Sequence, residues 1–145
     1  MGVVCAKRPV AVNEVIELRV MIYEDDWKRR LHMIYVVRQA QPGAEVQAFK
    51  NVTEAVAYAE KMQPEAAFIS VEQSDGRGYF LIKKLRNLTP RTNVIAVAKE
   101  CRFGAELMKL RISGYVTQRL TKEKVVEEMK NLRYREMETE QKAAL

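Results

Sequence analysis

Short apolar runs rich in β-branched residues alternate, between residues 18 and 134, with longer segments whose apolar positions recur at helical spacing. This alternation is typical of a parallel sheet whose strands are joined by crossover helices. The pattern predicts an α/β fold in which a doubly wound, five-stranded parallel sheet is covered by five helices. The expected strands are 18–23, 45–49, 66–71, 93–98 and 114–117.

Capping residues and apolar stripes mark the helices between these strands. Asp26, Asn51 and Thr121 each precede a helical segment and carry a side chain that can accept a hydrogen bond from its first turn. Glu54, three residues after Asn51, gives capping-box spacing. We expect each helix to turn one apolar stripe toward the sheet. The expected stripes are Leu31, Ile34 and Tyr35; Val52, Ala55, Val56 and Ala59; Leu81, Leu85 and Leu88; Phe103, Leu107 and Leu110; and Val125, Met129 and Leu132.

Length and composition fit one domain with short extensions. The chain has 145 residues, 48% of them hydrophobic, so we expect an N-terminal extension (1–17), one domain (18–134), and a tail (135–145) that extends the last helix or stays solvated. Neither Cys5 nor Cys101 has another Cys or His at the spacing of metal ligands, which fits a reducing compartment. No apolar run approaches the length of a membrane span. A cytoplasmic location is the expectation.

The net charge of +6 raises the question of nucleic-acid binding. Its 25 Lys and Arg residues are scattered among 19 Asp and Glu residues and form only short clusters such as Lys28-Arg29-Arg30. We interpret them as a solvated surface, and direct contact with nucleic acid is not expected.

Polar residues follow the strands at the edge where ligands bind in open parallel sheets. The first strand leads into Glu24, Asp25 and Asp26, and the third ends at Ser70. Such carboxylates suit Mg²⁺, although Asp26 is equally explained as a helix cap and Glu24 as a solvated strand end. No histidine is expected beside Ser70, because His32 falls inside the first helix, away from the strand ends. A serine-hydrolase mechanism therefore has no base.

The spacing of these positions resembles the receiver domain of bacterial response regulators over residues 18–134, a CheY-like, flavodoxin-like fold with strand order 2-1-3-4-5. Glu24 and Asp25 match the acidic pair that holds Mg²⁺ in that family. The run from Gly78 to Arg86 resembles the start of the helix after the family's third strand, and the phosphoryl-accepting Asp stands eight residues before its glycine. That position here is Ser70.

Two further positions depart from the family pattern. Ala98 stands where the family has a hydroxyl after the fourth strand, and Gln118 stands where it has a lysine after the fifth. Tyr115 matches the family's aromatic switch position. The resemblance therefore implies a degenerate pseudo-receiver, because the nucleophile, the reporting hydroxyl and the product-binding cation are all replaced. Asp75, five residues past Ser70, is poorly placed to substitute as acceptor.

The implied function is regulatory rather than enzymatic: a protein-binding module of two-component signalling that works without Asp phosphorylation. Its expected partner is a kinase or regulator, with a homodimer through the fourth helix, fifth strand and fifth helix as a further expectation. No cofactor is required by this interpretation, and Glu24 and Asp25 are the candidate Mg²⁺ ligands. The alternatives are a transcription regulator that contacts DNA, the receiver fragment of a longer transcriptional response regulator, and a small Mg²⁺-dependent phosphoryl-transfer enzyme.

Overall fold

Five parallel strands form one sheet in the order β2-β1-β3-β4-β5, which confirms the predicted fold. The computed structural model describes residues 18–73, 75–100 and 103–134. The predicted extensions, 1–17 and 135–145, lie outside this part. The strands are β1 (Arg19–Tyr23), β2 (Glu45–Phe49), β3 (Ala66–Ser70), β4 (Asn93–Val97) and β5 (Gly114–Val116).

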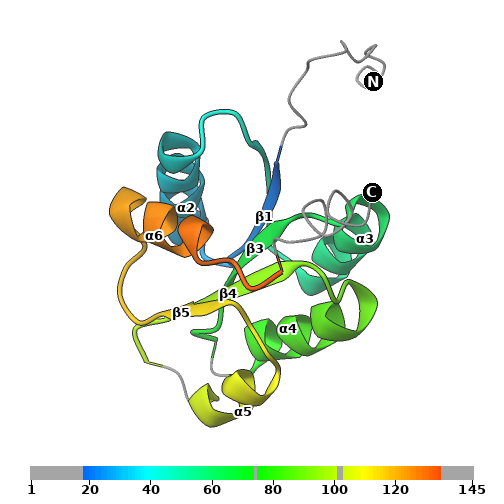
Figure 1. The fold of residues 1–145 in the computed structure, drawn as a ribbon. Helices are drawn as coiled ribbons and strands as arrows, with labels where there is room; N and C mark the ends of the chain where they lie inside the picture. Colours follow the sequence, from blue (N-terminus) through cyan, green and yellow to red (C-terminus); the bar gives the residue numbers. More distant parts are fainter. Residues whose placement is uncertain (1–17, 74, 101–102, 135–145) are drawn as a thin grey trace.

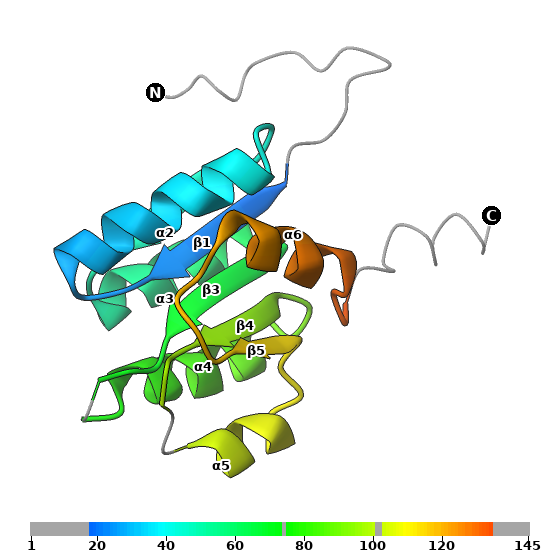
Figure 2. The ribbon, with the colours of Figure 1, turned by 90° about the vertical axis from the view of Figure 1, so that its left-hand side faces the viewer.

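Helices cover both faces of the sheet (Figures 1 and 2). On one face lie α2 (Trp27–Ala40) and α6 (Lys122–Lys130), which pack against each other. On the other face lie α3 (Val52–Met62), α4 (Arg77–Leu88) and the short α5 (Gly104–Lys109). Because all five strands are parallel, their carboxyl ends lie at the same edge of the sheet.

The three predicted caps are confirmed. Asp26 accepts a hydrogen bond from the Arg29 backbone N–H (2.9 Å), and Asn51 accepts one from Glu54 (2.8 Å). Thr121 accepts one from Lys124 (3.1 Å). Each cap satisfies a donor that the first helical turn leaves without a partner, so local sequence determines where these helices begin.

The core consists of two apolar layers, one on each face of the sheet. Alternate residues of a strand point to opposite faces. Met21 and Ile69 therefore join the layer under α3 and α4, whereas Ile22 and Phe68 join the layer under α2 and α6. Every residue of β3 and β4 is buried, as expected for central strands covered on both sides.

The predicted core stripe of α2 is wrong. Leu31 and Tyr35 are 56% and 62% exposed, and Met33, Val36 and Val37 face the sheet instead. Both triplets have helical spacing, so periodicity alone could not choose between them. Leu88 of α4 is likewise 39% exposed, and the buried stripe of that helix includes Ile82.

A buried polar residue, Asn93, ties the last described segment to the amino end of β4. Its amide donates to the Glu65 carbonyl (2.9 Å) and the Tyr134 carbonyl (3.3 Å). Its Oδ1 accepts from the Ser113 hydroxyl (2.8 Å) and the Tyr134 N–H (2.6 Å). Asn93 is 1% exposed, and these bonds account for its polar atoms.

Candidate functional site

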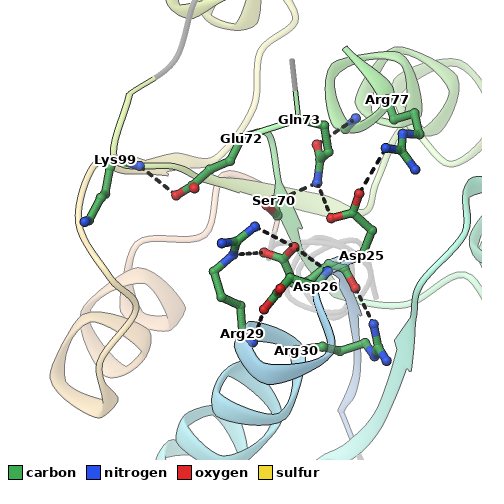
Figure 3. A network of polar contacts seen from close by, with 11 residues as sticks. Asp25, Asp26, Arg29, Arg30, Ser70, Glu72, Gln73, Arg77 and Lys99 are labelled. Atoms are coloured by element: carbon green, nitrogen blue, oxygen red, sulfur yellow. Dashed lines mark hydrogen bonds and ion pairs between the residues drawn. The ribbon is translucent and has the colours of Figure 1, made fainter. Parts of the chain in front are cut away.

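The parallel sheet brings the predicted site residues to one edge (Figure 3). Glu24, Asp25 and Asp26 follow β1, and Ser70 is the last residue of β3. Ser70 and Glu24 are 1% and 2% exposed, so both lie at the floor of the site. Ala98 and Gln118 follow β4 and β5, as the sequence indicated.

Arg29 forms an ion pair with the carboxylate of Glu24. The Arg29 Nε lies 3.1 Å from Glu24 Oε1, and its Nη2 lies 3.5 Å from Oε2. The backbone N–H of Asp26 also donates to Oε2 (3.0 Å), and Arg30 donates to the Glu24 carbonyl (2.8 Å). The hydrogen bond with Glu24 raises the pKa of Arg29. Arg29 is 52% exposed, so it belongs to the solvated surface and also pairs with Glu24, which the sequence did not predict.

A second arginine, Arg77 at the start of α4, pairs with Asp25. Its Nη2 lies 3.2 Å from Asp25 Oδ2, and its Nε lies 2.8 Å from Asp75 Oδ2. Hydrogen bonds from Arg77 lower the pKa of Asp75, which is therefore held as an ion-paired carboxylate on the surface. Both members of the predicted metal-binding pair thus have an arginine partner of their own.

Gln73 lies between Ser70 and Asp25, and the sequence did not predict it as a site residue. Its Nε2 lies 3.4 Å from both Ser70 Oγ and Asp25 Oδ1, while its Oε1 accepts from the Gly78 N–H (3.2 Å). Gln73 is 9% exposed. Gly78 is required here because a Cβ on it would collide with the Ser70 carbonyl and with Gln73 Oε1. The sequence indicated this close contact between α4 and β3 only through a glycine at the start of the helix.

Ser70 has no base among the described residues. The side chain within reach of its hydroxyl is the Gln73 amide, which cannot remove a proton. A serine hydroxyl that is not deprotonated by a neighbouring base is a poor nucleophile. The arrangement therefore positions Ser70 as a hydrogen-bonding group.

A cleft of about 300 Å³ opens beside Ser70, between the start of α2 and the segment joining β5 to α6. Four basic and two acidic side chains line it, namely Lys28, Arg29, Lys99, Arg119, Glu24 and Glu72. His32 also lines the cleft, so the expectation that it lies away from the strand ends was wrong. Its Nε2 lies 2.8 Å from the Leu120 carbonyl, which holds the α2 wall of the cleft to the start of α6.

Glu72, two residues after Ser70, fixes the loop after β3 to the end of β4. Its Oε2 accepts a hydrogen bond from the Lys99 backbone N–H (3.0 Å; Figure 3). Tyr115 is half-buried and packs against the core layer on the α4 side. The predicted switch position is therefore next to the core and outside the cleft lining.

The described part of the chain has neither a cluster of metal ligands nor a candidate membrane span. No group of three or more His, Cys, Asp or Glu side chains is placed to hold a metal ion there. None of its helices has both the length and the apolar character needed to cross a bilayer.

Comparisons with known proteins converge on one family. The family model described as "Response regulator receiver domain" matches residues 20–130. A comparison with curated proteins found no match. A CheY-like receiver domain protein from Methanospirillum hungatei has a similar structure, with a TM-score of 0.73 and 20% identity over 86% of this chain and 99% of that one.

Two further solved structures show the same fold. A putative response regulator from Chloroflexus aurantiacus is 22% identical, with a TM-score of 0.68, over 80% of this chain and 97% of that one. A chemotaxis protein of Vibrio cholerae is 16% identical, with a TM-score of 0.69, over 81% of this chain and 99% of that one. At these identities the likeness establishes the fold, and the chemistry of the site must come from the residues present in this chain.

Proposed function

Because this chain belongs to the response regulator receiver domain family, we propose that it acts in two-component signalling as a protein-binding regulatory module without Asp phosphorylation. Receiver domains are regulatory and interact with kinases or regulators, so a protein partner follows from the family. The finer claim concerns how the state of this domain is set. It rests on the residues at the strand ends.

The proposal rests on one observation: Ser70 is the last residue of β3, and the neighbouring carboxylates, Glu24 and Asp25, form ion pairs with arginines. Phosphoryl transfer to a receiver needs a carboxylate nucleophile, charge neutralisation by a metal, a cation for the product and a hydroxyl that reports it. Ser70 and Ala98 replace the first and the last of these. Gln118 donates a hydrogen bond but carries no charge.

The arrangement of the acidic pair does not fit Mg²⁺. Both oxygens of Glu24 are engaged by Arg29 or by the Asp26 N–H, and both oxygens of Asp25 are engaged by Arg77 or Gln73. Mg²⁺ would have to displace two guanidinium groups to reach these oxygens, and it dehydrates reluctantly. The arginines supply the positive charge that a metal supplies elsewhere in the family.

We assign the binding role to the face formed by α5, β5 and α6. Met108 on α5 is 66% exposed, and Tyr115 on β5 is half-buried between the core and this face. A partner, a kinase or regulator or a second copy of the chain, would select between rotamers of Tyr115 in place of phosphate. A receiver fragment of a longer transcriptional regulator would work in the same way, whereas a DNA-contacting regulator would show strongly salt-dependent DNA binding.

Amide shifts at the strand ends test this function directly. The protein of residues 1–145 is titrated with Mg²⁺ and then with beryllofluoride, and the amides of Glu24, Ser70 and Ala98 are followed by NMR. The native chain is expected to show no saturable shift with Mg²⁺, and no beryllofluoride shift that requires Mg²⁺. A triple variant, Ser70→Asp with Arg29→Met and Arg77→Met, restores the carboxylate and frees the acidic pair, and it should respond to Mg²⁺. A saturable response of the native chain to Mg²⁺, or a Mg²⁺-dependent response to beryllofluoride, would overturn the proposal.

A further inference from the structure

The cleft beside Ser70 carries more positive charge than its carboxylates can neutralise. Lys28 on α2, Lys99 after β4 and Arg119 after β5 are exposed and line it from three segments of the chain. Glu24 is already paired with Arg29, and Glu72 is bonded to the Lys99 backbone. Among the described residues, no carboxylate forms an ion pair with the side chains of Lys28, Lys99 or Arg119.

We propose that this cleft binds a small phosphomonoester reversibly, with Lys28, Lys99 and Arg119 holding the phosphate. Three cations on one concave surface repel one another, and a dianion placed between them relieves that repulsion. An arginine fork and two ammonium groups supply the charge-assisted donors that a phosphate needs. The charge of the cleft therefore favours a dianionic ligand.

The size and the walls of the cleft define the rest of the ligand. About 300 Å³ is the lower end of the range for small-molecule sites. Met33, Val97 and Leu120 give it apolar walls next to the cations. A compact ring or alkyl body joined to a phosphate, as in a nucleoside monophosphate, would use both features.

The wall of the cleft is already held in place without a ligand. The His32 ring is bonded to the Leu120 carbonyl, which joins α2 to the start of α6. Arg29 is bonded to Glu24, so it remains on the cleft floor. A preorganised site loses less conformational entropy when a ligand binds.

This inference rests on the proposed function, because the site is free to hold a phosphomonoester reversibly only if Ser70 accepts no phosphoryl group. The consequence is a second regulatory input: an anion bound at the start of α2 and α6 would stabilise the folded state, and this stabilisation would rise with the logarithm of the anion concentration above its Kd. The binding would also weaken as salt is added.

The test uses adenosine 5′-monophosphate, inorganic phosphate and adenosine as probes of the whole chain. Amide shifts and calorimetry are recorded for the native protein, Arg119→Gln, Lys28→Gln with Arg119→Gln, and the control Lys61→Gln on α3. The monophosphate is expected to bind more tightly than phosphate, adenosine not to bind, and Arg119→Gln to weaken binding roughly tenfold. Lys61→Gln should bind as the native chain does.

Absence of monophosphate binding at millimolar concentration would overturn the inference, and so would binding that is equal in the native chain and the double variant. The substituted side chains are exposed, so an unchanged melting temperature shows that each variant is folded. The protein mass must be unchanged after the titration. Covalent phosphorylation of Ser70 by a phosphodonor would instead refute the proposed function, so the two failures are distinguishable.

Discussion

Removal of the Arg29 side-chain charge is the sharpest test of the arginine-neutralised site. Arg29→Met keeps the aliphatic stem but leaves the carboxylate of Glu24 without its guanidinium partner. Glu24 is 2% exposed, and breaking a buried ion pair costs about 3–5 kcal/mol. Arg29 itself is 52% exposed, and the Asp26 N–H remains bonded to Glu24, so we expect a smaller loss, about 2 kcal/mol.

The assay is urea unfolding at pH 7, combined in a double-mutant cycle with Glu24→Gln. Glu24→Gln leaves a half-exposed arginine that water can solvate, and its cost is expected to be about 1 kcal/mol. The double variant should cost about as much as Glu24→Gln alone, because once the carboxylate is gone Arg29 has little left to stabilise. Arg38→Met, at the exposed end of α2, is the matched control, with an expected change within about 0.5 kcal/mol.

Added Mg²⁺ provides a second measurement on the same variants. The native protein should melt at the same temperature in MgCl₂ and in NaCl of equal ionic strength. Arg29→Met frees the Glu24 carboxylate beside Asp25, so Mg²⁺ should recover part of its lost stability. The reasoning fails if Arg29→Met costs less than about 0.5 kcal/mol, or if the two single changes are additive within that margin.

Other substitutions test the packing around the site and the titration of buried groups. Gly78→Ala should destabilise the fold by about 2–3 kcal/mol, because its Cβ collides with the Ser70 carbonyl; a melting temperature equal to that of the native chain would contradict the close approach. Asn93→Ala should cost about 2–3 kcal/mol in urea unfolding, since it removes four hydrogen bonds made by a buried side chain to partly buried partners. Burial raises the pKa of Tyr23 and of Tyr58, and neither hydroxyl has a partner in the described part of the chain. Because the pKa of each tyrosine is higher in the folded state, the unfolded chain loses these protons at a lower pH, and stability should fall as pH rises above about 10. Tyr23→Phe and Tyr58→Phe should each reduce that loss of stability.

The fold could be predicted because its determinants are local or periodic. The caps at Asp26, Asn51 and Thr121 each need one side chain and a backbone N–H three residues away, and all three formed. The central strands are continuous apolar runs that only a sheet covered on both faces can bury. The prediction of the buried stripe of α2 was wrong because two sets of residues have the same helical spacing. These sets are Met33, Val36 and Val37, which are buried, and Leu31, Ile34 and Tyr35, which were predicted.

The sequence predicted where the site residues lie, but it did not predict which side chains they pair with. Parallel strand ends converge, so Glu24, Asp25 and Ser70 could be placed together from the sequence alone. Which charged side chains pair depends on their direction, and Arg29 on α2 is no closer in sequence to Glu24 than Lys28 or Arg19 is. Gln73 was missed for a similar reason, because its role depends on the loop that carries it back over Ser70.

These contacts suggest how a receiver fold can keep its architecture while its chemistry is replaced. A metal held between two carboxylates neutralises charge and also positions it. Under the proposed function, two arginines that bond these carboxylates would stabilise the strand ends in place of an ion. Such a domain would hold one arrangement of its strand ends and leave regulation to whatever binds its surface.

The most direct measurement is the intact mass of the protein after incubation with acetyl phosphate and Mg²⁺, with peptide mapping of any modified species. The account predicts that the native mass is unchanged under conditions in which a typical receiver domain gains a phosphoryl group. A phosphoryl group mapped to Ser70 or to Asp75 would contradict it.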